Sequence, residues 1–376
     1  MPAIGSQPPR APIIPPHIMQ KIHQHQLEEM ARRATYGDIR PIIEVPDFAN
    51  HRFVAVRNRL YFKPKDEWKF FTDFLLYYGA ERFGQEWIDQ QKAAAPADQH
   101  PAYVWRNRAI AFMMRQPKRP DGTFAAAPNG TFAALISFYY DLYIVDDNSL
   151  LDDFLVQRLK HRDQFQGALH ELFAEATCLR AGFTIARENE RDGTRKHVEF
   201  VAIHQATGQH VLVEAKSRHR AGVMGQSGEA RDPDLRFRKL INDAIAKDPN
   251  NPLAIFVDTN LPADRANRFY APRAGDPPIP SAAMASILDK LRNDFGVDPY
   301  NLIVFSNHPQ HYSAGDAQAP GNQSSAFVSQ KPRVPVYREA AMHDLAKAVS
   351  LYGNVPTLFP PNRNQRIDGA PTTTVA

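Results

Sequence analysis

Three residues at the end of an apolar run form the pattern with the clearest chemistry in this chain, Glu214-Ala215-Lys216. Residues two apart on a β-strand point to the same face of a sheet, so the carboxylate of Glu214 and the ammonium of Lys216 would lie side by side. Such a pair can hold a metal ion beside a group that positions or activates water. A second acid, Glu199, lies on an earlier strand-like run, residues 197–203.

The acid-x-lysine triplet has little specificity by itself. At ordinary residue frequencies, on the order of one or two such triplets arise by chance in a chain of this length. The chain contains a second copy, Glu67-Trp68-Lys69, in a stretch whose apolar spacing is helical over residues 66–78. Residues two apart on a helix do not share a face. We therefore interpret the second copy as a coincidence.

A helix that carries two more acids is predicted before the strands. Apolar residues at helical spacing predict a helix over residues 167–180, and Gly182 has the position of a C-terminal capping glycine. Glu171 and Glu175 lie one turn apart on the same face of this helix. Glu171 is the favoured site residue because Gly167, one turn earlier, leaves room beside it.

Three strands are predicted after this helix, and the last two would form a hairpin. The turn between them contains Gly208, which can adopt a positive φ. Pairing around this turn places Glu199 roughly opposite Glu214, and directly opposed side chains approach to about 5 Å. The predicted strands cover residues 183–185, 197–203 and 210–215.

Alternating helices and buried strands follow. Continuous apolar strands are typical of a sheet that is covered on both faces, and strand–helix–strand spacing favours parallel crossovers. We therefore predict an α/β fold with a mixed central sheet flanked by helices. The later helices are expected at residues 235–246, 281–295 and 339–351, and the buried strands at 253–257 and 302–305.

The composition changes along the chain and indicates four parts. The first and last parts contain many Pro or Thr residues and are expected to be flexible tails. The second part is mainly helical and rich in aromatic residues, which are expected to form a core, and it begins with strand-like pieces at 53–56 and 60–62. The predicted parts are a tail at 1–16, a helical region at 17–155, an α/β domain at 156–356 and a tail at 357–376.

Residues 164–260 resemble the PD-(D/E)xK nuclease superfamily, which has the restriction-endonuclease-like fold. The resemblance rests on the order of elements: a helix with Glu, a strand, a strand with an acid, a turn, a strand that ends in Glu-x-Lys, then a helix and a strand. It implies that Glu214 and Lys216 are the acid and the lysine of the (D/E)xK element. Glu199 has the position where the family usually has Asp, often after Pro, whereas Val198 precedes it here.

The same resemblance implies further site residues and an activity. Glu171 matches the acid that is often found on the preceding helix, and the backbone carbonyl of Ala215 is an implied metal ligand. The implied cofactor is Mg²⁺ or Mn²⁺, and the implied activity is metal-dependent hydrolysis of phosphodiester bonds in nucleic acid, with DNA favoured as partner. The alternative is a catalytically inactive nuclease-fold module that binds nucleic acid or a protein, which the Glu at position 199 favours.

Elementary chemistry supports the same assignment. Phosphodiester cleavage needs neutralisation of a phosphate oxygen and an activated water, and Mg²⁺ is suited to carboxylate ligands, waters and phosphate. The competing interpretation is an ion-pair cluster of Glu199, Glu214 and Lys216 on an exposed sheet face, since charge on such faces is common.

Other polar residues have two interpretations each. Basic side chains near the strand end can contact phosphate or lie in a solvated turn. Asp258 and Asn260 follow a buried strand, where turn capping is favoured over a functional role. Pro309 between His308 and His311 predicts a loop and argues against zinc binding. The basic residues in question are Lys216, Arg218, His219, Arg220, Arg236, Arg238 and Lys239.

Composition excludes several classes of protein. The single cysteine, Cys178, excludes an internal disulfide and a cysteine-rich zinc site. The chain has no apolar run of about 18 residues and no signal pattern, so neither a membrane partner nor secretion is expected, and a cytoplasmic location is. The net charge of +4 permits a polyanionic partner without requiring one. Nothing in the sequence indicates the oligomeric state.

Overall fold

The structure is a computed structural model. The expected tails, residues 1–16 and most of 357–376, lie outside the part of the chain that it describes, as do residues 21–48 of the helical region. The described residues are 20, 49–124, 126–148, 151–187, 198–217, 237–247, 250–261, 282–312, 318, 323–336 and 340–359.

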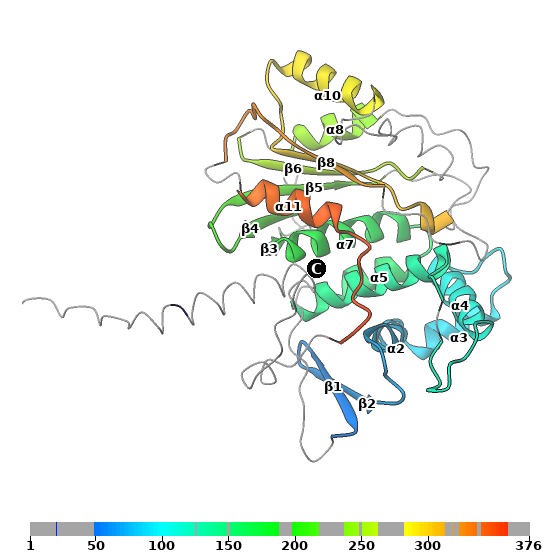
Figure 1. The fold of residues 1–376 in the computed structure, drawn as a ribbon. Helices are drawn as coiled ribbons and strands as arrows, with labels where there is room; N and C mark the ends of the chain where they lie inside the picture. The colour runs from blue at the N-terminus through cyan, green and yellow to red at the C-terminus, as the bar shows by residue number, and fades with distance from the viewer. Residues whose placement is uncertain are drawn as a thin grey trace, which may run out of the picture.

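The first described part is a hairpin followed by helices (Figure 1). The hairpin strands β1 and β2 pair antiparallel, as the strand-like pieces predicted. The elements of this part are β1 (His51–Val56), β2 (Arg59–Pro64), α2 (Phe71–Phe83), α3 (Gln85–Ala93), α4 (Pro101–Met114), α5 (Gly130–Asp147) and α6 (Asp153–Lys160).

Helix α5 is buried along almost its whole length. It is apolar or aromatic on nearly every side, which is typical of a helix inside a core, and it contacts α2, α4 and the later helix α7 (Phe165–Arg180). The rings of Phe71 and Phe74 lie edge to face against Tyr143, with centroids 5.5 and 5.6 Å apart. The prediction that these aromatic residues form a core is confirmed.

A six-stranded mixed sheet follows, with its strands in sequence order β3-β4-β5-β6-β7-β8. Strands β3, β4 and β5 pair antiparallel, β5, β6 and β7 pair parallel, and β8 is antiparallel to β7. This confirms the predicted fold class, although β8 was not predicted. The strands are β3 (Phe183–Arg187), β4 (Phe200–His204), β5 (His210–Lys216), β6 (Leu253–Asp258), β7 (Leu302–Ser306) and β8 (Ser325–Val328).

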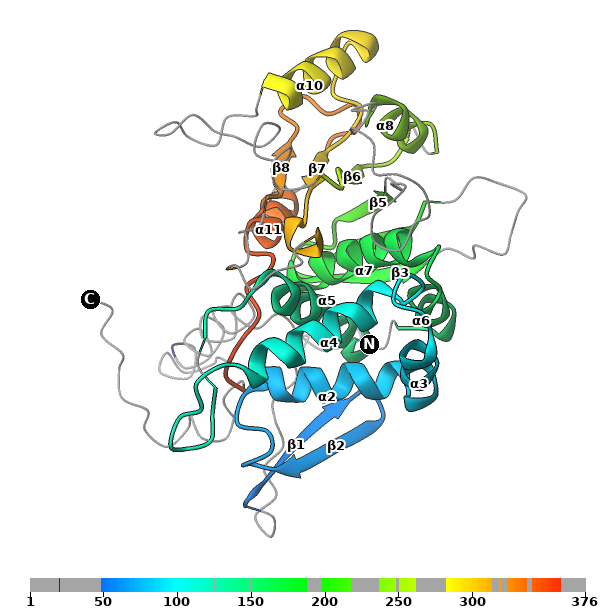
Figure 2. The same ribbon diagram turned by 90° about the vertical axis from the view of Figure 1, so that its right-hand side faces the viewer.

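Helices cover both faces of the sheet (Figures 1 and 2). Residues of α7 and α11 (Ala340–Ser350) share one core with one face of the strands, and residues of α8 (Phe237–Ile245) and α10 (Ala282–Phe295) share another core with the opposite face. Helix α7 also joins the two parts of the molecule, because its Leu172 packs in the aromatic core and its Phe173 packs under the sheet.

The placement of the second triplet on a helix was wrong, because Glu67-Trp68-Lys69 lies in the turn region before α2. Trp68 is buried and packs against Phe74 with ring centroids 5.2 Å apart. The backbone N–H of Phe70 donates to the carboxylate of Asp73 at 2.8 Å, which caps the helix three residues after the tryptophan.

Among the helices of the described residues, none has the length and apolar content that crossing a membrane requires.

Candidate functional site

Strand β5 presents Glu214 and Lys216 on one face of the sheet. Val213 and Ala215, which alternate with them, pack in the core beneath α7 and α11. Side chains alternate along a strand, so Glu214 and Lys216 point to the face that α8 and α10 cover. Glu214 is fully buried, whereas the side chain of Lys216 is 20% exposed.

The hairpin register brings the second acid alongside. Phe200, the first residue of β4, pairs with Val213 of β5. Continued by one step beyond its last pair, this antiparallel register would set Glu199, directly before β4, beside Glu214. The turn at the other end of the hairpin contains Gly208, whose φ is +69°.

A second lysine completes the cluster. The ammonium of Lys216 contacts Oε1 of Glu214. The ammonium of Lys247 lies 2.7 Å from the same oxygen and 3.8 Å from Oε1 of Glu199. Lys247 is therefore the side chain that links the two acids directly.

Sequence reasoning missed Lys247. It follows α8 by two residues, where a lysine is ordinary, because cations near a helix C-terminus interact favourably with the helix dipole. The one hint in the sequence was that Lys247 directly follows a predicted amphipathic helix. In the structure the apolar face of this helix, α8, packs on the sheet beside β5.

The buried carboxylate of Glu214 is only partly satisfied. Its Oε1 has the two ammonium groups, while its Oε2 is buried and has no hydrogen-bond partner among the described residues. A buried charge without pairing costs several kcal/mol or shifts to its neutral form. The unpartnered oxygen is available to a further donor or a cation.

Glu199 has a perturbed acidity. Burial, with added repulsion from the charges of Glu171 and Glu214, raises the pKa of Glu199 to about 7. Lys247 and Lys216 act in the opposite direction and are outweighed. Perturbed groups of this kind are enriched at functional sites.

Lys216 keeps its proton. Burial lowers the pKa of Lys216, but the charge of Glu214 and the hydrogen bond to it outweigh burial, so the net shift is upward. The side chain is therefore an ammonium at neutral pH, suited to donating hydrogen bonds or stabilising negative charge and unsuited to acting as a base.

The two acids of α7 are held by arginines. Glu171 receives hydrogen bonds from both terminal nitrogens of Arg158 at 2.5 and 2.6 Å. Glu175 receives hydrogen bonds from Nε of Arg187 at 2.9 Å and from one of its terminal nitrogens at 2.6 Å, and burial raises the pKa of Glu175 to about 7. Glu171 lies near enough for its charge to raise the pKa of Glu199. Both of its carboxylate oxygens, however, already accept hydrogen bonds from Arg158.

The donor set suits a hard cation with few protein ligands. Within the described residues, no group of three His, Cys, Asp or Glu side chains is arranged to hold a metal ion. Glu199 and Glu214 supply two carboxylates, and Oε2 of Glu214 has no partner there. Mg²⁺ usually keeps several waters and binds through one or two carboxylates. The carboxylates of Glu199 and Glu214 could bind such an ion once the ammonium of Lys247 has moved out from between them.

Other candidates are positioned for structural roles. The carboxylate of Asp258 accepts the backbone N–H of Asn260 at 3.0 Å, which is turn capping, and the hydroxyl of Ser217 at 3.3 Å. The guanidinium of Arg238 pairs with Asp294, and Lys239 is exposed. The remaining basic candidates, Arg218, His219, Arg220 and Arg236, lie outside the described residues.

Three histidines cluster in a cavity that neither Glu199 nor Glu214 lines. His170, His308 and His311 line a small cavity with Asp258. Pro309–Tyr312 forms a 3₁₀-helix, so the predicted loop was wrong there. Both ring nitrogens of His308 are buried without a hydrogen-bond partner among the described residues. Burial lowers the pKa of His170 to about 4 and of His311 to about 3.

These histidines should make the fold sensitive to acid. His170 stays neutral in the folded chain down to about pH 4, whereas the unfolded chain binds a proton at about pH 6.5. Its contribution to stability is therefore present above about pH 6.5 and is lost as pH falls towards 4. Between about pH 4 and pH 6.5, the free energy of unfolding of the wild type should fall by about 1.4 kcal/mol for each unit by which the pH is lowered, because of His170. His170→Gln should remove this dependence. Urea unfolding of both proteins at several pH values measures this, and parallel pH profiles would contradict it.

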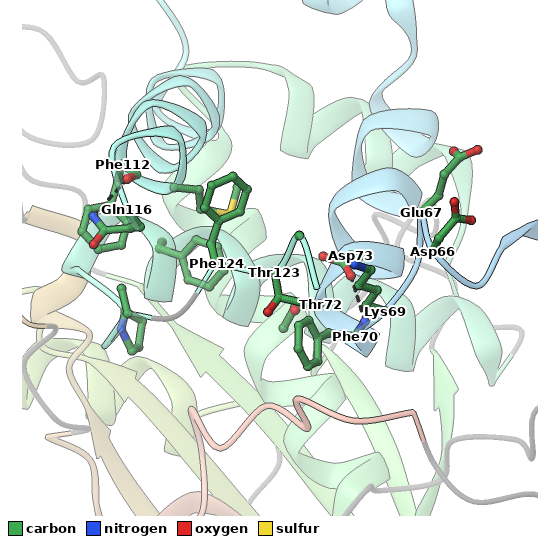
Figure 3. Close-up of a pocket in the computed structure, with 15 residues that line it drawn as sticks. Asp66, Glu67, Lys69, Phe70, Thr72, Asp73, Phe112, Gln116, Thr123 and Phe124 are labelled. Carbon is green, nitrogen blue, oxygen red and sulfur yellow. Dashed lines mark hydrogen bonds between the residues drawn. The ribbon is translucent and has the colours of Figure 1, made fainter. Parts of the chain in front are cut away.

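The helical region contains a separate cavity of about 280 Å³. Figure 3 shows its walls, with Phe70, directly before α2, and Thr72 of α2 on one side and Thr123 and Phe124 on the other. The ammonium of Lys69 donates to the backbone oxygen of Asp121 and ties the loop that contains Asp121 to the turn directly before α2. None of the site residues predicted from the sequence lines this cavity, so it is distinct from the carboxylate cluster.

No protein-family model, curated protein or solved structure matches the chain in comparisons with known proteins.

Proposed function

We propose that this protein is a metal-dependent nuclease that hydrolyses phosphodiester bonds in nucleic acid. The observation that carries the proposal is the convergence of Glu199, Glu214 and Lys216 at one end of the β4–β5 pair, with Glu214 fully buried. The elements α7, β3, β4, β5, α8 and β6 follow the order on which the resemblance to PD-(D/E)xK nucleases rests.

Each residue has a distinct part in the proposed reaction. Glu199 and Glu214 would hold Mg²⁺ or Mn²⁺, with the carbonyl of Ala215 as the further ligand that the resemblance implies. The bound ion would neutralise a phosphate oxygen and lower the pKa of a coordinated water. Lys216, held as an ammonium by Glu214, would orient the attacking water or stabilise charge that develops on the phosphate. Glu171, fixed by Arg158, would act on Glu199 through its charge.

The proposed substrate is DNA, and the proposed location is the cytoplasm. The basic net charge of +4 is compatible with a polyanion, and the one cysteine, Cys178, is a buried free thiol, as is usual in a reducing compartment.

Incubation of the purified protein with labelled single- and double-stranded DNA and RNA tests the proposal. We expect cleavage products with Mg²⁺ or Mn²⁺ and none with EDTA, because the two carboxylates need a cation to engage a phosphate. Cleavage that continues in EDTA, or no cleavage of any substrate with either ion, would contradict it.

One observation favours an inactive nuclease-fold module instead. Lys247 already links the two carboxylates, which is how a module without metal would balance their charge. Such a module would bind nucleic acid or a protein partner equally well with and without divalent ions and would never cut. Binding measured by fluorescence anisotropy in EDTA and in Mg²⁺ separates the two functions.

A further inference from the structure

Lys247 bridges two carboxylates that would otherwise repel each other. Its ammonium lies 2.7 Å from Glu214 and 3.8 Å from Glu199, and its side chain is 19% exposed. Because the carboxylate of Glu214 is fully buried, water screens this pair of acids poorly. A cation between the two acids offsets this repulsion.

The cluster contains two acids and two lysines. Two carboxylates, Glu199 and Glu214, face two ammonium groups, Lys216 and Lys247. The nearby acid Glu171 is paired with Arg158, which donates a hydrogen bond to each of its carboxylate oxygens. Lys216 lies on β5 beside Glu214, so only Lys247, among these described groups, spans the gap between the two acids.

We infer that Lys247 is an internal counter-ion, which holds the cation position between Glu199 and Glu214 and leaves it when a divalent ion binds. This inference rests on the metal site of the proposed function. A lysine suits exchange because its charge is carried on a flexible four-carbon stem. Lys247 lies in a turn beyond α8, and its partly exposed side chain has a path to solvent.

The exchange lowers the affinity for metal. A divalent ion binds only the fraction of molecules in which Lys247 has left, so the apparent dissociation constant is the intrinsic constant divided by that fraction. The displaced ammonium also remains near the bound ion and repels it. Removing the charge of Lys247 should therefore tighten metal binding, although it removes a partner of both acids.

Titration calorimetry with Mg²⁺ and with Mn²⁺ tests this on the full chain, with Lys247→Met as the variant. Lys290→Met is the matched control, because Lys290 is an exposed lysine of α10 on the same side of the sheet. We expect Lys247→Met to bind about tenfold more tightly than wild type and Lys290→Met to bind like wild type. Unchanged or weaker binding by Lys247→Met overturns the inference.

Thermal unfolding gives a second readout that needs no activity. In EDTA, Lys247→Met should melt about 5 °C below wild type, because the acids lose their shared cation. Saturating Mg²⁺ should restore most of that loss in the variant and change wild type less. Lys247→Arg, which keeps the charge, should melt like wild type in EDTA. If the melting temperature of Lys247→Met is lowered and Mg²⁺ does not reduce that difference, the inference is overturned.

The two proposals can fail separately. Metal-dependent cleavage by wild type, together with unchanged metal affinity in Lys247→Met, leaves the nuclease standing and removes the counter-ion role. Tighter metal binding in Lys247→Met, with no cleavage by wild type, leaves the counter-ion role standing and removes the nuclease. If neither protein binds a divalent ion, both proposals fail.

Discussion

Lys216→Ala is expected to lower the rate of metal-dependent cleavage by about a thousandfold. The ammonium of Lys216 is fixed by Glu214 and kept charged by it. A charged donor in a partly buried site stabilises developing negative charge far more than it would in water. Single-turnover cleavage of labelled DNA in Mg²⁺ measures the loss in the chemical step.

The second acid-x-lysine triplet provides the control. Lys69→Ala, which removes the lysine of Glu67-Trp68-Lys69, should leave cleavage within a few-fold of wild type, because Lys69 is tied to the loop at Asp121. Calorimetry on Lys216→Ala should show that metal binding is retained. Equal loss in both variants, or no loss in Lys216→Ala, would show that Lys216 has no role in the chemical step.

Glu214→Gln is expected to abolish metal binding and to destabilise the fold. The neutral amide cannot replace the carboxylate as a metal ligand, and it leaves Lys216 and Lys247 with less negative charge to pair with. Removing one partner of a buried pair costs about 3–5 kcal/mol. Because the two lysine side chains are 20% and 19% exposed, water screens them in part, and we expect about 2 kcal/mol. Calorimetry and urea unfolding measure the two effects.

Glu175→Gln is the matched control for Glu214→Gln. Glu175 is also a buried acid, but it lies on α7 and is held by Arg187 of β3, so this variant should lose stability and keep metal binding. Retained metal affinity in Glu214→Gln would exclude this residue as a ligand. A loss of metal affinity in both variants would show that the effect comes from destabilisation alone.

The sequence was sufficient to predict most of the sheet, for local reasons. The strands at 253–257 and 302–305 are apolar at every position, so their side chains are buried only if both faces of the sheet are covered. Glycine at 208, with its positive φ, closed the β4–β5 hairpin and fixed its register. The parallel crossovers through α8 and α10 followed from spacing alone. Strand β8 was missed because its four residues are half-buried and show no strong alternation.

The start of a helix was harder to predict, because it depends on packing. Apolar spacing placed residues 66–69 on a helix, yet burial of Trp68 and the cap between Phe70 and Asp73 begin α2 at Phe71. The spacing of apolar residues does not show that Trp68 packs against Phe74 from a turn before the helix rather than from the helix itself.

The sequence by itself determined that Glu214 and Lys216 share a strand face, because side-chain alternation is a local property of the backbone. Only the tertiary structure decided how their charges are balanced. Arg158 takes both oxygens of Glu171, thirteen residues away, and Lys247 reaches Glu214 across 33 residues of chain. Ion pairs of this kind depend on how helices lie against the sheet, and no local pattern in a sequence fixes that.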